Sequence, residues 1–305
     1  MEYKYRFTVF TPCYNSSKFI HRVIERLESQ TYKNFEWLVI DDASTDNTVE
    51  IILDYIKKSQ FPINFIRNSE TQMLTKNINI AFQNAKGEFI VFLGHDDKIM
   101  PEALEVFNYI WSKFGNSNIS GIKCLCQDQF GKLIGKKFPE DLLISDYFTI
   151  TYKLNYDKEL FGCTRTDVLR EFYFDTEFGS YIPESVLWGN IGMKYKTIWV
   201  NKILRIYYIE PENKLALTKS GRKKYADGIN YLYLKWINDF EKFLEGKLLF
   251  KLRIRFAYGF YGILSKKKII SLIKSVNLKS NKILVLIFYP LAFITYILLK
   301  ITRRL

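Results

Sequence analysis

The chain has 305 residues, which is enough to bury one large α/β core or two smaller ones. Hydrophobic residues make up 48% of it, and this content excludes an intrinsically disordered protein. The net charge of +13 is concentrated at one end, because residues 246–305 hold thirteen Lys and Arg and no Asp or Glu, while the rest of the chain holds 32 of each sign. A protein that binds nucleic acid more often spreads its basic residues over a folded face, so this distribution argues against one.

The cysteines and the first residues indicate the compartment. Cys13, Cys124, Cys126 and Cys163 form no Cys-x-x-Cys pair and predict no disulfide framework, so buried thiols are expected. Residues 1–10 alternate polar and apolar side chains and lack the basic region and apolar stretch of a secretory signal. We therefore expect folding to begin in the cytosol.

The first hundred residues alternate strand and helix signals. Short apolar runs predict strands at residues 6–11, 35–40, 63–67 and 88–93. Periodic apolar positions between them predict helices that end near Ser29, Lys57 and Asn84, and Pro101 fits the first turn of the next helix. This spacing predicts βαβ units and a mostly parallel sheet flanked by helices.

Ligands of such sheets bind beyond the carboxyl ends of the strands. That rule selects three loops, at residues 12–17, 41–46 and 94–98, and each of them carries polar or acidic side chains after an apolar strand.

From about residue 116 the pattern changes to shorter strands and turns. Residues 128–132 predict a hairpin, residues 183–195 a helix, and residues 197–200 and 204–208 two late strands.

The tail has a different character. Residues 283–299 carry no charge but are interrupted by Pro290, and a spanning helix needs about 20 apolar residues, so this stretch is borderline. Residues 247–282 mix aromatic and aliphatic side chains with Lys and Arg, which suits helices lying among anionic lipid headgroups. We expect membrane association, with flat helices favoured over a span. The alternative is a helical subdomain whose charges are merely solvated.

Asp96 and Asp97 carry the strongest chemical signal. An apolar strand delivers these two adjacent carboxylates into a loop at the ligand edge of the sheet. Adjacent carboxylates repel one another unless they are solvated, protonated or bridged by a cation. Mg²⁺ and Mn²⁺ take oxygen ligands and commonly share them with substrate phosphates. The alternative is a turn before a helix, with Asp97 favoured by the positive helix end.

Asp41 and Asp42 form a second acidic pair, directly after the strand at residues 35–40. Ser44, Thr45 or Asp46 is sufficient to cap the helix that follows. Capping leaves two further carboxylates unexplained, and a carboxylate at that place can accept a hydrogen bond from a base or a ribose.

These segments together resemble glycosyltransferase family 2. The resemblance is carried, in order and spacing, by residues 8–15, 27–32, 37–48, 76–77 and 85–97 and by Pro101. Gly162, Phe174, residues 182–184, Trp188 and residues 200–201 resemble members of bacterial polysaccharide, O-antigen and capsule assembly more loosely. The resemblance implies the glycosyltransferase A fold and an inverting transfer from a nucleotide sugar, usually a UDP-sugar.

The resemblance also implies roles for single residues. It places the donor nucleotide against Pro12, Tyr14, Asn15, Asp41, Asp42, Lys76, His95 and Asp96. Among these, Asp42 matches the uracil contact and Lys76 lies near the base or the diphosphate. Asp96 matches the second acid of the Asp-x-Asp motif, which coordinates the divalent metal, Mn²⁺ or Mg²⁺. Gly94 replaces the first acid, so Asp97 is expected as the second metal ligand, with His95 as the alternative.

A general base must deprotonate the acceptor hydroxyl as it attacks the anomeric carbon. Glu184, at a predicted helix start where the family places its base, is the expected catalytic residue. Asp175 and Glu177 are the alternative bases. A purely structural alternative is that Glu184 is an acid in the first turn of a helix, where it interacts favourably with the helix dipole.

Together these observations predict a catalytic domain at residues 1–212, with a nucleotide-sugar half (1–115) and an acceptor half (116–212), and a basic helical membrane-association region at 213–305. The expected protein is a metal-dependent hexosyltransferase, peripheral or monotopic on the cytoplasmic face of the inner membrane. Its expected partners are a UDP-sugar, a polyprenyl-diphosphate-linked glycan acceptor and an anionic membrane surface, without nucleic acid. The alternatives are a polyprenyl-phosphate glycosyltransferase and a non-catalytic basic protein that binds nucleic acid or membranes.

Overall fold

The computed structural model describes residues 2–156, 158–209 and 223–302, and the chain divides into two compact units. The first unit comprises Met1–Tyr173 and Asn190–Pro211, and the second comprises Phe174–Gly189 and Glu212–Leu305. The predicted boundary at residues 212 and 213 lies outside the described residues. The assignment of residues 174–189 to the second unit was not expected from the sequence.

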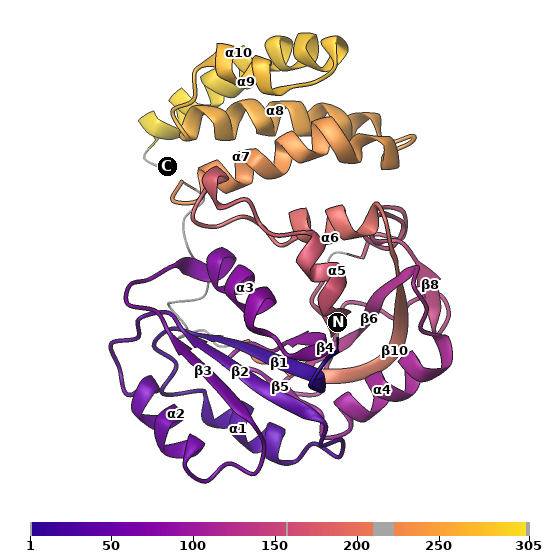
Figure 1. Ribbon diagram of the computed structural model, residues 1–305. Helices are drawn as coiled ribbons and strands as arrows, with labels where there is room; N and C mark the ends of the chain where they lie inside the picture. Colours follow the sequence, from indigo (N-terminus) through magenta and orange to yellow (C-terminus); the bar gives the residue numbers. More distant parts are fainter. Residues whose placement is uncertain (1, 157, 210–222, 303–305) are drawn as a thin grey trace. The chain divides into compact units, whose positions relative to one another are not determined.

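The amino-terminal half of the first unit alternates strands and helices, as the apolar patterns predicted (Figure 1). Its elements are β1 (Tyr5–Cys13), α1 (His21–Glu28), β2 (Phe35–Asp41), α2 (Thr48–Ile56), β3 (Ile63–Arg67), α3 (Met73–Asn84), β4 (Gly87–Phe92), β5 (Lys98–Ile99) and α4 (Ala103–Phe114). All seven residues of β2 are buried, which explains why its sequence is continuously apolar apart from Glu36 and Asp41.

The later part of the unit contributes shorter elements. They are β6 (Ile119–Asp128), β7 (Leu133–Ile134), β8 (Leu143–Ser145), a π-helical turn (Thr149–Lys153), β9 (Leu160–Arg165), α5 (Thr166–Glu171) and β10 (Lys196–Tyr207). The predicted hairpin joins β6 to β7, where Asp128 N–H donates to Lys132 O and Gly131 adopts a φ of 82°. The two predicted late strands form the single strand β10, which is irregular between Val200 and Ile203.

The sheet has the strand order β3-β2-β1-β4-β9-β6-β10-β5. β1 pairs in parallel with β2 and β4, and β2 pairs in parallel with β3. β9 enters antiparallel between β4 and β6, so the sheet is mixed. β1 to β4 therefore run parallel and their carboxyl ends meet at one edge, while β6 and β10 form a second parallel pair in the later half.

Helices cover both faces of the sheet, with α1 and α2 on one side and α3 on the other (Figure 1). Val9, Val39 and Val91 pack with Val23 of α1 and Phe107 of α4 in one large cluster of buried side chains. On the opposite face Phe82 of α3 meets Phe92 edge-to-face, and Phe92 meets Phe10 in the same way. A core on both faces makes the central strands rigid supports for the loops that follow them.

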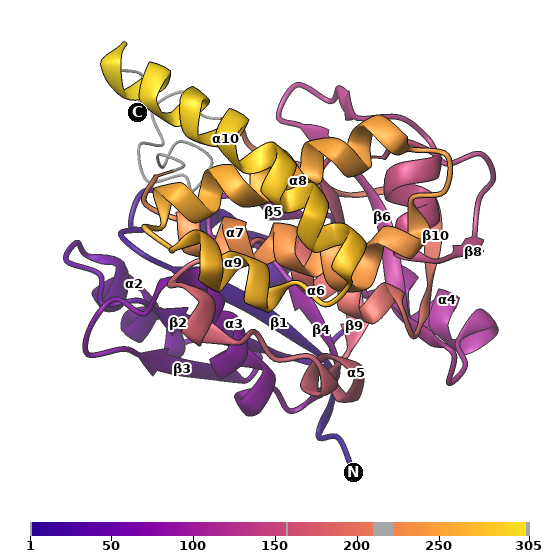
Figure 2. The same cartoon turned by 90° about the horizontal axis from the view of Figure 1, so that it is seen from above.

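The described part of the second unit consists of helices and loops. It contains a 3₁₀ turn (Thr176–Phe178), α6 (Ser185–Gly192, of which the residues from Asn190 on belong to the first unit), α7 (Ala226–Lys235), a π-helical turn (Trp236–Phe240), a 3₁₀ turn (Glu241–Phe243), α8 (Leu248–Leu264), α9 (Ile269–Ser275) and α10 (Lys279–Ile301). α10 lies over α8, and α8 packs on α7 (Figure 2). The basic, apolar helical region predicted at the carboxyl end is therefore present.

Candidate active site

The turn that carries Asp96 follows the central strand β4. Leu93 N–H donates to Phe10 O (2.9 Å), which continues the β1–β4 ladder one residue beyond the strand. A β-turn from Gly94 to Asp97 follows, closed by Asp97 N–H donating to Gly94 O at 3.3 Å. Asp96 is half-buried in this turn and Asp97 is buried. The structure thus places the predicted metal-binding acid at the carboxyl end of a parallel strand.

Gly94 shapes the two carboxylates. A Cβ atom at this position would lie 3.0 Å from Asp96 Oδ1 and 3.1 Å from Asp97 Oδ2, which is closer than side chains normally approach. Both carboxylates therefore converge on the space that any other residue at position 94 would occupy. Gly94 leaves that space open to the two carboxylates.

Asp97 makes structural contacts with both of its oxygens. Oδ2 pairs with the Arg205 guanidinium at 2.9 Å, and Oδ1 accepts a hydrogen bond from the backbone N–H of Tyr208 at 3.0 Å. Burial raises the pKa of Asp97 to about 7, against the opposing effect of Arg205, and the charge of Asp96 adds to the increase. The metal-ligand role of Asp97 remains a prediction, and the geometry gives this residue a separate one, namely joining the Asp96 turn to the end of β10.

The three predicted ligand loops meet in space. Asp42 N–H donates to Cys13 O at 2.8 Å, which joins the ends of β1 and β2. His95 Nδ1 lies 3.3 Å from Pro12 O, within hydrogen-bond distance, and joins the end of β1 to the Asp96 turn. Pro12 itself is part of β1 and does not begin the following turn. These contacts confirm that the first, second and fourth strands present their loops at a common edge.

Arg22 is a residue of this edge that the sequence did not reveal. From α1 it donates through Nη1 to Asp96 O at 3.0 Å. Its guanidinium lies over the Tyr208 ring at 4.0 Å and the Phe19 ring at 5.0 Å from the respective centroids. A guanidinium packed against two rings has few other positions open to it, so its hydrogen bond restrains the backbone of the Asp96 turn.

The Asp41–Asp42 pair divides into two roles. The carboxylate of Asp42 accepts from Asn68 Nδ2 and Gln72 N–H through Oδ1 and from Met73 N–H through Oδ2, so it organises the loop before α3. Asp41 is fully buried, and its Oδ2 accepts from Ser44 N–H at 3.1 Å. Its Oδ1 has no hydrogen-bond partner among the described residues.

An unpartnered buried carboxylate oxygen is costly, and a bound ligand that donates a hydrogen bond would satisfy it. Asp41 Oδ1 is therefore the atom at this edge that best fits a hydrogen bond from a bound ligand.

The other residues predicted to bind the donor nucleotide lie in the loop after β1 and on α3. Asn15 has a φ of 49°, and its side-chain oxygen accepts from Thr45 N–H at 2.8 Å, which ties the β1 loop to the β2 loop. Tyr14 beside it is 37% exposed. Lys76 is exposed on α3, where Nζ donates to Gln72 Oε1 at 3.1 Å.

Glu184 belongs to the second unit. It is exposed and directly precedes α6, and its backbone oxygen accepts from Trp188 N–H at 3.0 Å, so the predicted helix start is confirmed. Burial, with the charge of Glu184 next in size, raises the pKa of the neighbouring Tyr181 to about 12. Asp175 accepts from Glu177 N–H at 3.2 Å and begins a 3₁₀ turn. The catalytic role of Glu184 remains a prediction.

The donor set fits a metal that takes most of its ligands from the substrate. Among residues 2–156, 158–209 and 223–302 no group of three or more His, Cys, Asp or Glu side chains is placed to hold a metal ion. Mg²⁺ is commonly bound by one or two carboxylates together with substrate phosphates and water. Asp96, at the tip of its turn, fits the single protein carboxylate of such a site.

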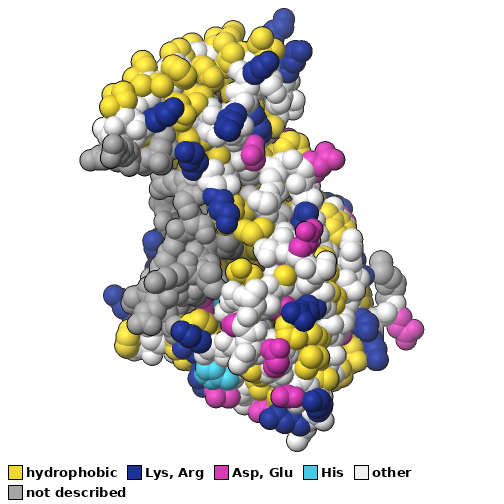
Figure 3. Space-filling view, turned by 90° about the vertical axis from the view of Figure 1, so that its left-hand side faces the viewer, with side chains coloured by type: hydrophobic (Ala, Val, Ile, Leu, Met, Phe, Trp, Pro, Cys, Tyr) yellow, Lys and Arg dark blue, Asp and Glu magenta, His cyan; other side chains and the backbone are white. Residues whose placement is uncertain are grey.

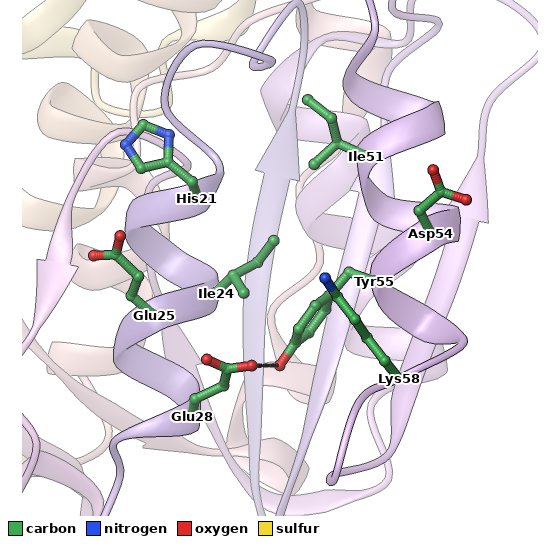
Figure 4. Close-up of a pocket in the computed structure, with 8 residues that line it drawn as sticks. All are labelled: His21, Ile24, Glu25, Glu28, Ile51, Asp54, Tyr55 and Lys58. Carbon is green, nitrogen blue, oxygen red and sulfur yellow. Dashed lines mark hydrogen bonds between the residues drawn. The ribbon is translucent and has the colours of Figure 1, made fainter.

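A hollow of 440 Å³ lies elsewhere on the first unit, between α1 and α2 (Figure 4). Glu28 accepts a hydrogen bond from the Tyr55 hydroxyl across it (2.9 Å), and Glu25 and Asp54 add acidic side chains from the two sides. None of the predicted site residues lines it. The hollow is thus separate from the edge that carries Asp96.

A mostly parallel sheet of this kind binds its ligands beyond the carboxyl ends of its strands, and acidic turns lie at that edge here. The family model of glycosyl transferase family 2 matches residues 8–174, which span all three loops. The chain belongs to this family and is a glycosyltransferase.

Relatives of known or assigned activity support this membership. The chain is 27% identical over 246 residues to a GalNAc(5)-diNAcBac-PP-undecaprenol beta-1,3-glucosyltransferase of Campylobacter jejuni, covering 80% of this chain and 75% of the relative. It is 32% identical over 124 residues to the putative glycosyltransferase EpsE of Bacillus subtilis, covering 41% of this chain and 45% of that one.

Solved structures share the fold. TarS of Staphylococcus aureus, solved with UDP-GlcNAc, matches with a TM-score of 0.61 at 17% identity, covering 95% of this chain and 91% of that chain. A mannosyltransferase of Pyrobaculum calidifontis, solved with GDP-Man and Mn²⁺, matches with a TM-score of 0.54 at 16% identity, covering 95% and 81%. These similarities confirm the predicted glycosyltransferase A fold.

Proposed function

We propose that this glycosyltransferase is inverting and metal-dependent, and that it moves a hexose from a UDP-sugar onto a hydroxyl of a membrane-bound, polyprenyl-diphosphate-linked glycan. The observation that carries the proposal is the convergence of Asp41, Asp42 and the Asp96 turn at one edge of the sheet, where Asp42 N–H bonds Cys13 O and His95 Nδ1 lies 3.3 Å from Pro12 O. TarS, which shares the fold, was solved with UDP and with UDP-GlcNAc.

The first two loops bind the nucleoside. Asp42 Oδ2 accepts one protein hydrogen bond, so it keeps a lone pair for the N3–H of uracil. Asp41 Oδ1, which lacks a partner in the described structure, accepts from a nucleoside hydroxyl or base. Pro12, Tyr14 and Asn15 form the wall beside them.

The Asp96 turn binds the diphosphate. Asp96 would hold the divalent cation, Mn²⁺ or Mg²⁺, which when bound neutralises the negative charge that develops on the departing UDP. The Arg22 side chain bonds the Asp96 backbone, and the His95 side chain lies within hydrogen-bond distance of the Pro12 carbonyl. The Arg22 and His95 side chains are therefore already in place before the sugar is transferred. Lys76 adds a cationic side chain to the diphosphate side of the site.

Glu184 serves as general base. Its exposed carboxylate accepts the proton of the acceptor hydroxyl as that hydroxyl attacks the anomeric carbon from the face opposite the leaving UDP. One C–O bond forms, the bond to UDP breaks, and the sugar is transferred with inversion.

The acceptor is inferred from a relative and from the tail. The Campylobacter relative is named for a glycan on undecaprenyl diphosphate. α10 is long and apolar enough to cross a membrane and is mostly exposed in the second unit. A basic, apolar unit would hold the enzyme at the cytoplasmic face of the inner membrane, where such glycans are assembled.

The test is transfer itself. Detergent-purified enzyme, a panel of UDP-sugars and lipid-linked oligosaccharides are combined with Mn²⁺, and the products are followed by mass spectrometry. We expect one sugar to be added to the glycan, and Glu184→Gln to lower the rate by about 10²–10⁴-fold while UDP affinity stays unchanged. Asp175→Asn and Glu177→Gln are the matched controls. Transfer to polyprenyl phosphate alone would contradict the proposed acceptor. A loss of activity confined to Asp175→Asn or to Glu177→Gln would contradict Glu184 as the base and assign that role to the residue changed.

A further inference from the structure

α10 has one packed face and one apolar face that is exposed among the described residues of the second unit. Asn281, Val285 and Ala292 are buried against the other helices of the unit. Ile283, Ile287, Leu291, Ile294, Leu298 and Ile301 recur at helical spacing on the opposite side, and each is between 52% and 72% exposed. These six side chains are called the apolar stripe. Within the described residues, α10 is the one helix long and apolar enough to cross a membrane, with a mean hydropathy of 2.2.

α8 is fixed along α10 by a close contact and a buried polar network. Gly259 of α8 faces Ala292 and Tyr289, and a Cβ at Gly259 would lie 3.5 Å from Ala292 Cβ. At the start of α10, the Arg255 guanidinium is 2% exposed and donates both to Glu241 and to Asn281 Oδ1. The two helices therefore form one body, and α10 does not move without α8.

The charges around the stripe favour an anionic surface. Residues 246–305 hold thirteen Lys and Arg and no Asp or Glu. Arg253 on α8 and Lys266 and Lys268 in the following turn are exposed. Hydrophobic side chains gather over the carboxyl-terminal helices, with Lys and Arg at their margin (Figure 3). An apolar face bordered by cations fits a bilayer that contains acidic lipids.

The packing also determines how α10 can meet the bilayer. If α10 crossed the hydrocarbon, α8 would be carried into it together with Arg253 and the Arg255–Glu241 pair, and intramembrane charges are strongly disfavoured. A helix lying in the membrane plane buries the stripe and leaves α8 on the aqueous side.

We propose that α10, held in place by α8, is a monotopic docking surface for anionic membranes, and that it lies flat with the apolar stripe inserted at the boundary between headgroups and acyl chains. This inference deepens the proposed function, on which it rests for the place of the acceptor. At 1.5 Å per residue, the 23-residue helix lays roughly 35 Å of apolar surface on the membrane.

Vesicle sedimentation of the full chain tests the surface. We expect binding to vesicles of phosphatidylcholine mixed with phosphatidylglycerol, weaker binding to phosphatidylcholine alone, and loss of the difference at high salt. Ile287→Gln with Ile294→Gln is expected to weaken binding by at least about tenfold. Leu53→Gln with Phe130→Gln changes exposed apolar residues of the first unit and is the matched control. Equal binding by the two double variants would overturn the proposal.

Thiol labelling distinguishes a flat helix from a span. The four native cysteines are buried, so an introduced thiol is read against a low background. Ser112→Cys marks the side of the first unit, and Thr302→Cys marks the end of α10, both at exposed positions. In sealed inside-out membrane vesicles, we expect a membrane-impermeant maleimide to react with both variants without detergent.

Reaction of Thr302→Cys only after detergent, with Ser112→Cys reacting before it, would show a span and overturn the proposal. Neither experiment involves UDP or sugar transfer. A failure of the proposed catalytic function would therefore leave both results intact, and a failure of docking would leave nucleotide binding intact.

Discussion

Asp97→Ala is the substitution that most directly tests how the acidic turn is held. Asp97 is 2% exposed and pairs with Arg205 at 2.9 Å, and Arg205 is itself 9% exposed. Removing one partner of a buried ion pair leaves the other charge uncompensated, at a typical cost of about 3–5 kcal/mol. Glu159 lies 3.5 Å from the same guanidinium nitrogen and offsets part of that cost, so we expect a loss of about 3 kcal/mol.

Thermal unfolding of the full chain in detergent, followed by tryptophan fluorescence, measures the effect. A loss of this size corresponds to a fall in Tm of about 6–12 °C for a unit of this length. The matched control is Asp54→Ala, which removes an ion pair with Lys57 in which both side chains are 74% exposed, and no measurable change is expected there. If Asp97→Ala changes Tm no more than Asp54→Ala, the structural role assigned to the Asp97–Arg205 pair is wrong.

Three further results are expected. Gly94→Ala places a methyl group about 3 Å from the Asp96 and Asp97 carboxylates. We expect it to weaken metal-dependent UDP binding by about tenfold in calorimetry. Unchanged affinity would show that the convergence of the two acids is unimportant for binding. Arg22→Ala removes the hydrogen bond to Asp96 O and the cation–π contact with Tyr208. We expect it to raise the Kd for UDP by about 5–30-fold. An unaltered Kd would argue against Arg22 as a positioning residue. Because burial raises the pKa of all four cysteine thiols, none should react with maleimide at neutral pH until denaturant is added, and rapid labelling of the native protein would contradict their burial.

The strands that support the site were predictable because they are short apolar runs, fully buried in β2 and partly buried in the edge strand β3. Ile63–Arg67 was predicted at the bounds the structure has, and Phe35–Asp41 with an error of one residue. β10 was divided in two because Asn201 and Lys202 interrupt its apolar pattern. In the structure this interruption is an irregularity in the pairing of one strand. The Asn201 side chain accepts a hydrogen bond from Phe138 N–H and donates one to Phe138 O.

The acidic loops of the site were predictable for a related reason, since each follows a strand whose end can be read from the sequence. Arg22 and Arg205 were not predictable. Arg22 meets Asp96 across 74 residues, and the end of β10 meets Asp97 across 111 residues. A single sequence carries no signal for contacts at that separation, because a basic residue on a helix or strand is usually solvated.

Calorimetry of UDP binding to the detergent-purified chain, with and without Mn²⁺, tests the central claim of a nucleotide-diphosphate site at the Asp96 turn. The parent protein should bind UDP more tightly with Mn²⁺, and Asp96→Asn should lose that metal-dependent increase while it keeps the weaker metal-independent binding. If UDP binds neither with nor without Mn²⁺, or if Asp96→Asn binds with the full Mn²⁺ dependence of the parent, the proposed site is contradicted.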